Sequence, residues 1–136
     1  MPELLCDEES EPIAIRFRQQ LNENSKILCR NNTIPEQNHN EILGRNDVRK
    51  DIVPIFLRHG YEHPRNTVRI EFMKDHVKQL IDNSIEIIAQ GDSKFIQMLY
   101  LIYLTDRVSF FLADIRGVDP EFVPSVEKLK SKMSTL

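Results

Sequence analysis

Two segments of the chain carry apolar residues at the spacing of an amphipathic helix, three or four positions apart. In the first, Ala14, Phe17 and Leu21 predict the core-facing side of a helix that Ser10 caps and that ends near Asn24. The second helix is predicted over residues 66–82. Its core-facing stripe consists of Val68, Phe72, His76, Val77, Leu80 and Ile81.

Three further helices are indicated by proline and glycine positions and by composition. Residues 35–43 predict a short helix that Pro35 opens and Gly44 ends. A long apolar helix is expected from residue 94 to 116, with Gly117 at its end. A last helix is expected from residue 122 to 133.

Short apolar runs between these helices predict strands. They are residues 4–6, 26–29, 52–57, where Pro54 weakens the pattern, and 85–89, which we expect to be buried. Strands that alternate with helices predict a parallel sheet covered on both faces, as in a small three-layer α/β domain.

Candidate chemistry lies in two polar, asparagine-rich stretches, residues 20–26 and 36–44. They contain Glu23 and His39, a carboxylate and an imidazole that can share proton-transfer work at neutral pH. Ligands of parallel sheets gather at the carboxyl ends of the strands. We therefore expect Glu23, His39 and the loop at residues 59–63 to meet at such an edge or at a partner surface.

Length and charge narrow the class of protein. The 136 residues suffice for one domain with a core, and the net charge of -3 gives no electrostatic case for binding nucleic acid or an anionic membrane. The acidic N-terminus lacks the pattern of a signal peptide. The longest apolar run, residues 95–104, has about half of the roughly 20 residues that a membrane-spanning helix needs, so a buried helix is expected. Cys6 and Cys29 form no CxxC pattern, so reduced thiols and a cytoplasmic location are expected.

Three other features favour structural roles. His59 and His63 lie in a loop and have no nearby cysteine or paired carboxylate in the sequence, so we predict no metal site. Asp106 and Arg107 interrupt the apolar helix and are candidates for pairing across an interface; a structural ion pair is favoured over a chemical role. The run 95–104 is apolar all round, which favours core or a partner surface.

Several stretches of the sequence together resemble a known protein family. The chain is similar to the second half of the bifunctional phosphoglucose/phosphomannose isomerases of archaea and bacteria, which contain two sugar isomerase (SIS) domains in tandem. The stretches that carry the resemblance are residues 21–26, 38–42, 62–65, 101–110 and 117–120, followed by Leu129 and Lys130.

The resemblance implies an aldose–ketose isomerisation of hexose 6-phosphates, in which glucose or mannose 6-phosphate becomes fructose 6-phosphate through an enediolate, without metal or organic cofactor. The family's catalytic base matches Glu23, and its ring-opening histidine, which reaches the site from a neighbouring subunit in related enzymes, matches His39. A substrate-contacting lysine matches Lys130, with Lys128 and Lys132 as alternatives.

The chain also departs from the family. In the two-domain enzymes the phosphate is held mainly by Ser/Thr-rich loops of the first SIS domain, which also supplies an arginine that stabilises the enediolate. Here the first strand leads into the acidic residues 7–9, which would repel a phosphate. Residues 1–136 are therefore expected to be a single second-half SIS domain that acts as a homo-oligomer or with a separate first-half chain. The alternatives are a non-catalytic module that binds carbohydrate derivatives and a degenerate fragment.

Overall fold

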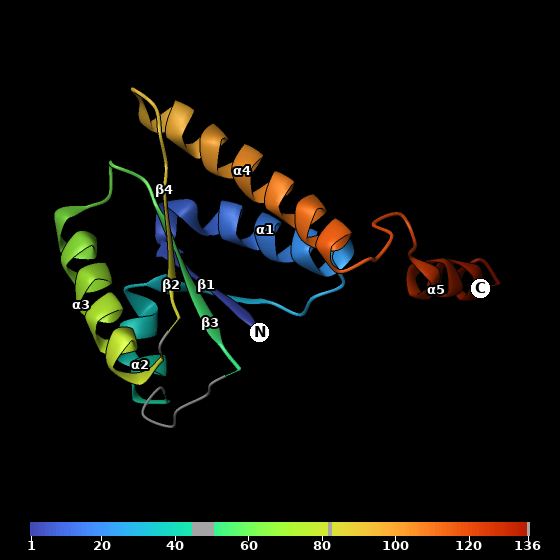
Figure 1. The fold of residues 1–136 in the computed structure, drawn as a ribbon, viewed down its shortest axis with the longest axis horizontal. Coiled ribbons are helices and arrows are strands. Elements are labelled where there is room, and N and C mark those ends of the chain that lie inside the picture. Colours follow the sequence, from blue (N-terminus) through green and yellow to red (C-terminus); the bar gives the residue numbers. More distant parts are fainter. Residues whose placement is uncertain (45–50, 82, 136) are drawn as a thin grey trace.

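The structure, a computed structural model, describes residues 1–44, 51–81 and 83–135 (Figure 1). Its centre is a parallel sheet of four strands in the order β2-β1-β3-β4. The strands are β1 (Pro2–Asp7), β2 (Arg30–Ile34), β3 (Val53–Arg58) and β4 (Ile85–Ile88).

Helices cover both faces of the sheet, so the predicted three-layer α/β architecture is confirmed. The helices α1 (Glu11–Glu23) and α4 (Lys94–Ile115) lie on one face, and α3 (Pro64–Leu80) lies on the other with the short η2 (Glu36–His39) and α2 (Glu41–Gly44). The helix α5 (Pro124–Met133) stands apart from these layers (Figure 1).

Alternation along β1 explains how one strand supports two cores. Leu4 and Cys6 face α1, where they pack with Phe17, whereas Leu5 faces α3 and packs with Met73. Successive side chains of a strand point to opposite faces, so a strand buried on both sides is apolar throughout its middle.

One predicted strand is wrong. Residues 26–29 form a connection in which Lys26 has a φ of 56°, and the second strand is the following polar segment, Arg30–Ile34. Only Ile34 of that strand is fully buried. Because β2 is an edge strand, one side of it meets water, and apolar content is a poor guide to such a strand.

Two expectations about burial are also wrong. The segment expected as a buried strand forms β4 at the other edge of the sheet, where Ile85 and Ile88 are largely exposed. On α3 the buried residues are Ile70, Met73 and Val77. Of the predicted stripe, Val68 and Phe72 are exposed and only Val77 is buried. The predicted helix end at residue 82 lies outside the described residues.

The remaining helices lie close to their predicted bounds. Ser10 is the N-cap of α1, and Ser93 accepts a hydrogen bond from the backbone of Ile96 at the start of α4. Gly117 follows the end of α4 with a φ of 63°, a left-handed conformation that glycine adopts without strain. The short helix expected over residues 35–43 is divided between η2 and α2.

Candidate active site

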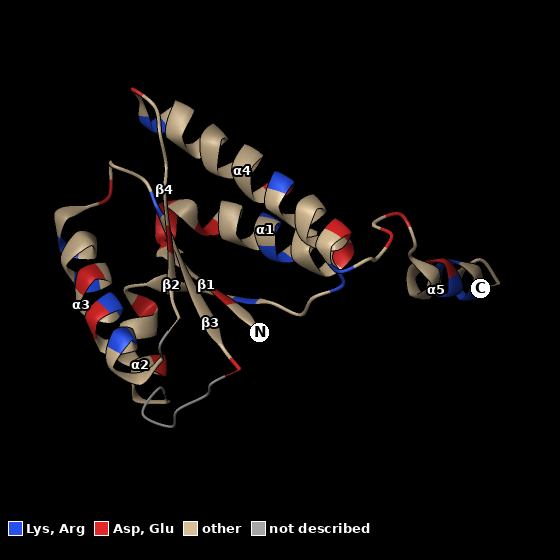
Figure 2. Ribbon diagram, in the orientation of Figure 1, with Lys and Arg blue, Asp and Glu red and all other residues tan. Residues whose placement is uncertain are grey.

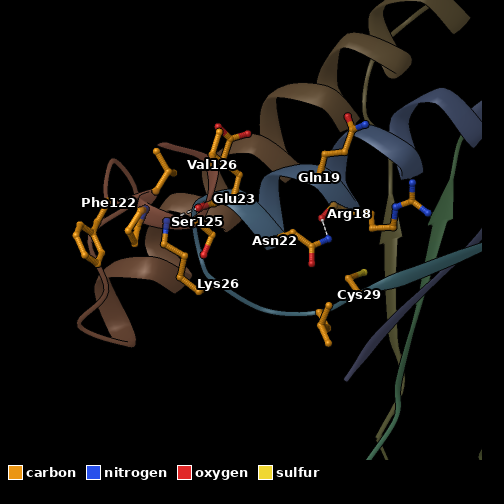
Figure 3. Close-up of a pocket in the computed structure, with 12 residues that line it drawn as sticks. Arg18, Gln19, Asn22, Glu23, Lys26, Cys29, Phe122, Ser125 and Val126 are labelled. Carbon is orange, nitrogen blue, oxygen red and sulfur yellow. Dashed lines mark hydrogen bonds between the residues drawn. The ribbon is translucent and has the colours of Figure 1, made fainter. Parts of the chain in front are cut away.

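Glu23 is the last residue of α1 and lies exposed at the rim of a groove of about 950 Å³ (Figure 3). The groove runs between the end of α1, the connection to β2 and the start of α5. Its lining residues are Arg18, Gln19, Asn22, Glu23, Lys26, Leu28, Cys29, Phe122, Val123, Pro124, Ser125 and Val126.

A buried polar network fixes the end of α1 against α4. Asn24 Nδ2 donates to Gln20 Oε1 at 2.7 Å and to Ser109 Oγ at 2.8 Å. Ser25 Oγ donates to the backbone oxygen of Ser109 at 2.6 Å. Both residues after Glu23 are buried, so these bonds are shielded from water and hold the backbone that carries the carboxylate.

Lys26 links the same helix end to the segment before α5. Its Nζ donates to the backbone oxygen of Glu23 at 2.6 Å and to that of Pro120 at 3.2 Å. A lysine at this position satisfies a free carbonyl at the helix C-terminus. Lys26 and Arg18 are the two cationic side chains that line the groove, together with the carboxylate of Glu23. Sequence reasoning did not single out either cation as a site residue, although Lys26 lies in the stretch 21–26 that carries the family resemblance.

Cys29 lines the groove as a neutral thiol. Burial, the largest influence, raises its pKa to about 11, so the thiolate is scarce near neutral pH. It therefore contributes packing to the groove and not a nucleophile.

His39 and Glu23 lie at opposite ends of the strands: His39 at the carboxyl ends and Glu23 at the amino ends. It ends η2, beyond the carboxyl end of β2, and its side chain is exposed. Helix α1 runs back against the strand direction and ends where β2 is about to begin, so Glu23 lies at the amino edge (Figure 1). The expectation that both residues meet at one edge is therefore wrong within one copy of the chain.

The structure does not bring Lys130 to the groove. It lies in α5 together with Lys128 and Lys132, and every residue of this helix is exposed. Only the first turn of α5, through Val126, lines the groove.

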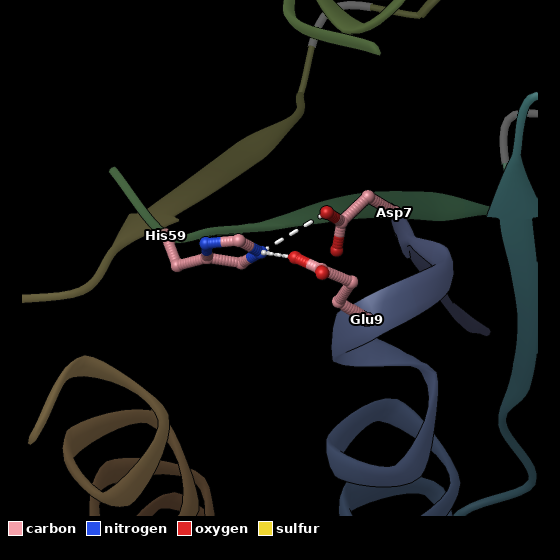
Figure 4. A group of neighbouring side chains, drawn as sticks. All are labelled: Asp7, Glu9 and His59. Carbon is pink, nitrogen blue, oxygen red and sulfur yellow. Dashed lines mark hydrogen bonds and ion pairs between the residues drawn. The ribbon is translucent and has the colours of Figure 1, made fainter. Parts of the chain in front are cut away.

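At the carboxyl edge, Asp7, Glu9 and His59 form a compact cluster (Figure 4). His59 Nε2 lies 3.0 Å from Asp7 Oδ2 and 3.7 Å from Glu9 Oε2, and its Nδ1 accepts from the backbone of Tyr61 at 3.2 Å. An imidazole that accepts through Nδ1 carries its proton on Nε2 when neutral, so it donates to Asp7. Burial raises the pKa of Asp7, but the hydrogen bonds from His59 and Ser10 outweigh burial and hold this pKa below its usual range.

This cluster corrects one argument from the sequence. The fold does supply two carboxylates to His59, with ligand atoms all within 4.8 Å of one another. Both carboxylates already have other partners: Asp7 accepts from the Ser10 backbone at 3.0 Å, and Lys94 Nζ lies 2.5 Å from Glu9. A cation would have to displace the proton on Nε2 and compete with Lys94. The arrangement thus fits a structural ion pair better than a metal site.

The ion pair expected in the apolar helix is confirmed for Asp106, although its partner is not Arg107. The Arg16 guanidinium binds both Asp106 oxygens, with Nη2–Oδ2 at 2.7 Å and Nε–Oδ1 at 3.0 Å, and so joins α1 to α4. Arg107 instead lies over the ring of Tyr103, 5.3 Å from its centre.

Comparison with known proteins agrees with this architecture. The sequence profile of the family described as the bacterial phospho-glucose isomerase C-terminal SIS domain matches residues 1–133. A bifunctional phosphoglucose/phosphomannose isomerase from Caldicellulosiruptor bescii is 36% identical over 131 residues, which cover 93% of this chain and 38% of the relative. The corresponding protein of Aquifex aeolicus is 32% identical, over 89% of this chain and 38% of its own length.

Solved structures share the fold at low sequence identity. A glucose-6-phosphate isomerase like protein from Thermus thermophilus has a TM-score of 0.67 and 17% identity, over 88% of this chain and 38% of its own. The C-terminal domain of glucosamine-fructose-6-phosphate aminotransferase from Francisella tularensis has a TM-score of 0.64 and 18% identity, over 89% of this chain and 37% of its own. The chain thus spans about two-fifths of the proteins that it matches.

The sheet order, the two helical layers and the profile match over residues 1–133 lead to one assignment. The chain belongs to the family of bacterial phosphoglucose isomerase C-terminal SIS domains.

Proposed function

We propose that residues 1–136 act as a single SIS domain, the second half of a hexose 6-phosphate isomerase, with Glu23 as the base. The observation that carries the proposal is the position of Glu23: an exposed carboxylate on a rigidly anchored helix end, at the rim of a groove large enough for a sugar phosphate. The names of the relatives, which are isomerases of phosphoglucose and phosphomannose, support the substrate class.

Glu23 suits the proton transfer of such a reaction. In the open-chain sugar, the carboxylate removes the proton from the carbon next to the carbonyl, and the electron pair moves onto the carbonyl oxygen to give an enediolate. A hydroxyl proton passes from the adjacent oxygen to the former carbonyl oxygen, and the same carboxyl group returns a proton to the former carbonyl carbon. Aldose and ketose thus interconvert without net redox change. Cations that face the enediolate lower its energy, and Arg18 and Lys26 are the lining residues able to do so.

His39 is proposed to open the sugar ring in the site of another copy of the chain. Its exposed position at the carboxyl edge, across the sheet from Glu23, supports a role between copies and not within one. Lys130 is proposed to contact the substrate on the strength of the family resemblance; it lies on α5 beyond the first turn, the part of this helix that borders the groove.

A first SIS half is proposed to complete the site. The chain spans 38% of the length of its curated relatives, and its own β1 runs into the carboxylates of Asp7 and Glu9 instead of a phosphate cradle. A cytoplasmic location belongs to the same proposal, and the free thiols of Cys6 and Cys29 agree with it.

The test is a coupled assay that follows glucose 6-phosphate formed from fructose 6-phosphate, with the chain alone and with the first half of the Caldicellulosiruptor bescii relative added. We expect Glu23→Gln to reduce the rate by at least about 100-fold, the lower range for general acid–base catalysis. Glu11→Gln, an exposed carboxylate at the other end of α1, is the matched control and should leave the rate unchanged. Activity that survives Glu23→Gln would contradict the assignment of the base.

A second candidate is a sugar-phosphate-binding module without turnover. It is favoured by the separation of Glu23 from His39, which leaves the groove of one copy without a ring-opening group. Calorimetry that detects hexose 6-phosphate binding, together with no isomerisation under any pairing, would support it over the isomerase.

A further inference from the structure

A second cleft, of about 480 Å³, lies at the carboxyl ends of the strands, away from the groove beside Glu23. Its walls come from the end of β1 and the turn η1 (Glu8–Ser10) that follows it, the residue after β2, the loop after β3 and the start of α3. The residues proposed above for the isomerase chemistry do not line this cleft. It therefore needs an explanation of its own.

The topology of the sheet explains why a cleft forms here. The strands β1 and β3 are neighbours, but the chain turns from β1 to α1 on one face of the sheet and from β3 to α3 on the other face (Figure 1). The two connections leave the sheet in opposite directions and open a crevice between them. Such a switch point is where open parallel sheets bind their ligands.

The two walls of the cleft carry opposite charges. Glu8 and Glu9 lie on the β1 side, and Arg65 and Arg69 lie on the α3 side. Figure 2 shows acidic residues where the chain turns from β1 toward α1, and both signs of charge along α3. Glu9 pairs with Lys94, whereas the side chains of Glu8 and both arginines form no ion pair or hydrogen bond with any residue that the structure describes. The opposite charges thus line one cleft without pairing across it.

The basic wall suits a phosphate group. Arg69 is half-buried, and a charge that is partly removed from water is costly unless it is paired. Guanidinium groups bind phosphate oxygens through paired N–H donors, and Arg65 and Arg69 together match the double negative charge of a phosphate. Asn66 lines the same wall and adds a side-chain amide to these donors.

The acidic wall requires a cation on the same ligand, because its carboxylates would repel a phosphate alone. Asp7 is already bound to His59, and Glu9 to Lys94, so Glu8 is the carboxylate left for that cation. Ser10 ends the same turn, is fully buried, and its hydroxyl has no hydrogen-bond partner among the described residues. Buried hydroxyls are nearly always bonded, so this one favours a bound molecule nearby.

An aromatic ring gives the cleft an apolar surface. Tyr61 is 48% exposed, and its hydroxyl donates to the backbone oxygen of Asp92 at 3.1 Å, which holds the ring in place. Aromatic side chains beside a few polar groups are typical of small-molecule sites. The cleft thus combines a flat surface with one charge of each sign.

We infer that this cleft binds an amino sugar phosphate, with the phosphate on Arg65 and Arg69 and the ammonium group on Glu8. The two charges of such a ligand lie on opposite sides of the sugar ring, as the walls require. In an α-amino acid they lie on neighbouring groups and cannot reach both walls. The binding uses no residue of the groove, so it stands or falls independently of the isomerase proposal.

Isothermal titration calorimetry of the purified chain with glucosamine 6-phosphate tests the inference. We expect binding that Arg69→Gln and Glu8→Gln each weaken by about tenfold or more, because each removes a charge-assisted contact. Glucose 6-phosphate lacks the ammonium group, so Glu8→Gln should not weaken its binding. Arg18→Gln, the matched change in the groove, should leave the affinity for glucosamine 6-phosphate unchanged.

Two-dimensional NMR of the isotope-labelled wild-type chain locates the ligand without a mutation. The amide signals of Tyr61 and Asn66 should shift when glucosamine 6-phosphate is added, and those of Lys26 and Cys29 should not. Circular dichroism confirms that the variants are folded. The absence of binding, an unchanged affinity in Arg69→Gln, or shifts confined to the groove would overturn the inference. Binding that persists in an inactive Glu23→Gln variant separates it from the isomerase proposal.

Discussion

At the scale of single residues, the chain shows how a surface carboxylate is held without being buried. Glu23 itself is exposed, but the next two residues are buried and bonded to Ser109. The asparagine-rich composition around Glu23 therefore has a structural cause, since Asn24 and Ser25 join two helices. The catalytic interpretation rests on Glu23 alone and not on the richness of its surroundings.

The buried pair of Asp7 and His59 gives a prediction about pH. The pKa of Asp7 lies below its usual value in the folded protein, so the folded state binds fewer protons than the unfolded state in acid. The stability that this group contributes is present above the ordinary aspartate pKa of about 4 and is lost as the pH falls below it.

Urea unfolding at a series of pH values, followed by circular dichroism, checks this. We expect Asp7→Asn to be less stable than wild type at neutral pH, and the difference to shrink below pH of about 4. Glu8→Gln, an exposed neighbour, should follow the wild-type curve. A difference that stays constant across the acid range would show that Asp7 is not the group responsible.

At the scale of elements, α1 and α4 are joined by two kinds of contact that contribute unequally to the free energy of unfolding. Leu101 of α4 is fully buried and packs in the same cluster as Ile13 of α1. The Arg16–Asp106 pair crosses the same two helices but is partly exposed. Exposed ion pairs contribute little to stability, because solvent screens the charges and both side chains lose conformational freedom.

The two contacts can be compared by mutation. We expect Leu101→Ala to lower the free energy of unfolding by about 2–5 kcal/mol, because it leaves a cavity in the core. Asp106→Asn should change the free energy of unfolding far less and serves as the matched control on the same helix. Chemical denaturation measures both, and an equal loss in the two variants would mean that the ion pair contributes as much as the buried leucine.

At the scale of the whole molecule, the separation of Glu23 and His39 limits how a site can be assembled. One copy places Glu23, the proposed base, at the amino ends of the strands and the His39 imidazole at their carboxyl ends. If both act on one substrate, the two residues must come from different copies, and complementation between inactive variants measures this.

In the presence of the first half of the Caldicellulosiruptor bescii relative, we expect Glu23→Gln and His39→Gln to be inactive separately and to regain activity when mixed after reversible unfolding. In a twofold dimer each mixed pair has one intact site, and half of the dimers are mixed, so about one quarter of the wild-type activity should return. Mixing Glu23→Gln with itself is the control. Failure to regain activity, while the two variants demonstrably form mixed oligomers, would place both residues in the site of one copy or remove His39 from it.

Parts of this protein followed from the sequence alone. The alternation of strands and helices, the bounds of α1 and α4 and the buried face of α1 were predictable, because caps and helical periodicity are local signals. Glu23 and His39 were found as candidates through residue type and the family resemblance, and their roles stay predictions.

Other features were decided only by the tertiary structure. The sequence alone did not predict that β2 and β4 are edge strands. It also did not predict that α3 buries Ile70 and Met73 instead of Val68 and Phe72. The approach of Asp7 and Glu9 to His59 was likewise not predictable from the sequence. These outcomes depend on which element packs beside which, and neighbours far apart in the sequence leave no local pattern. The same physical reason explains why Glu23 and His39, only 16 positions apart, lie at opposite ends of the strands: β2 carries the chain from the amino ends to the carboxyl ends between them.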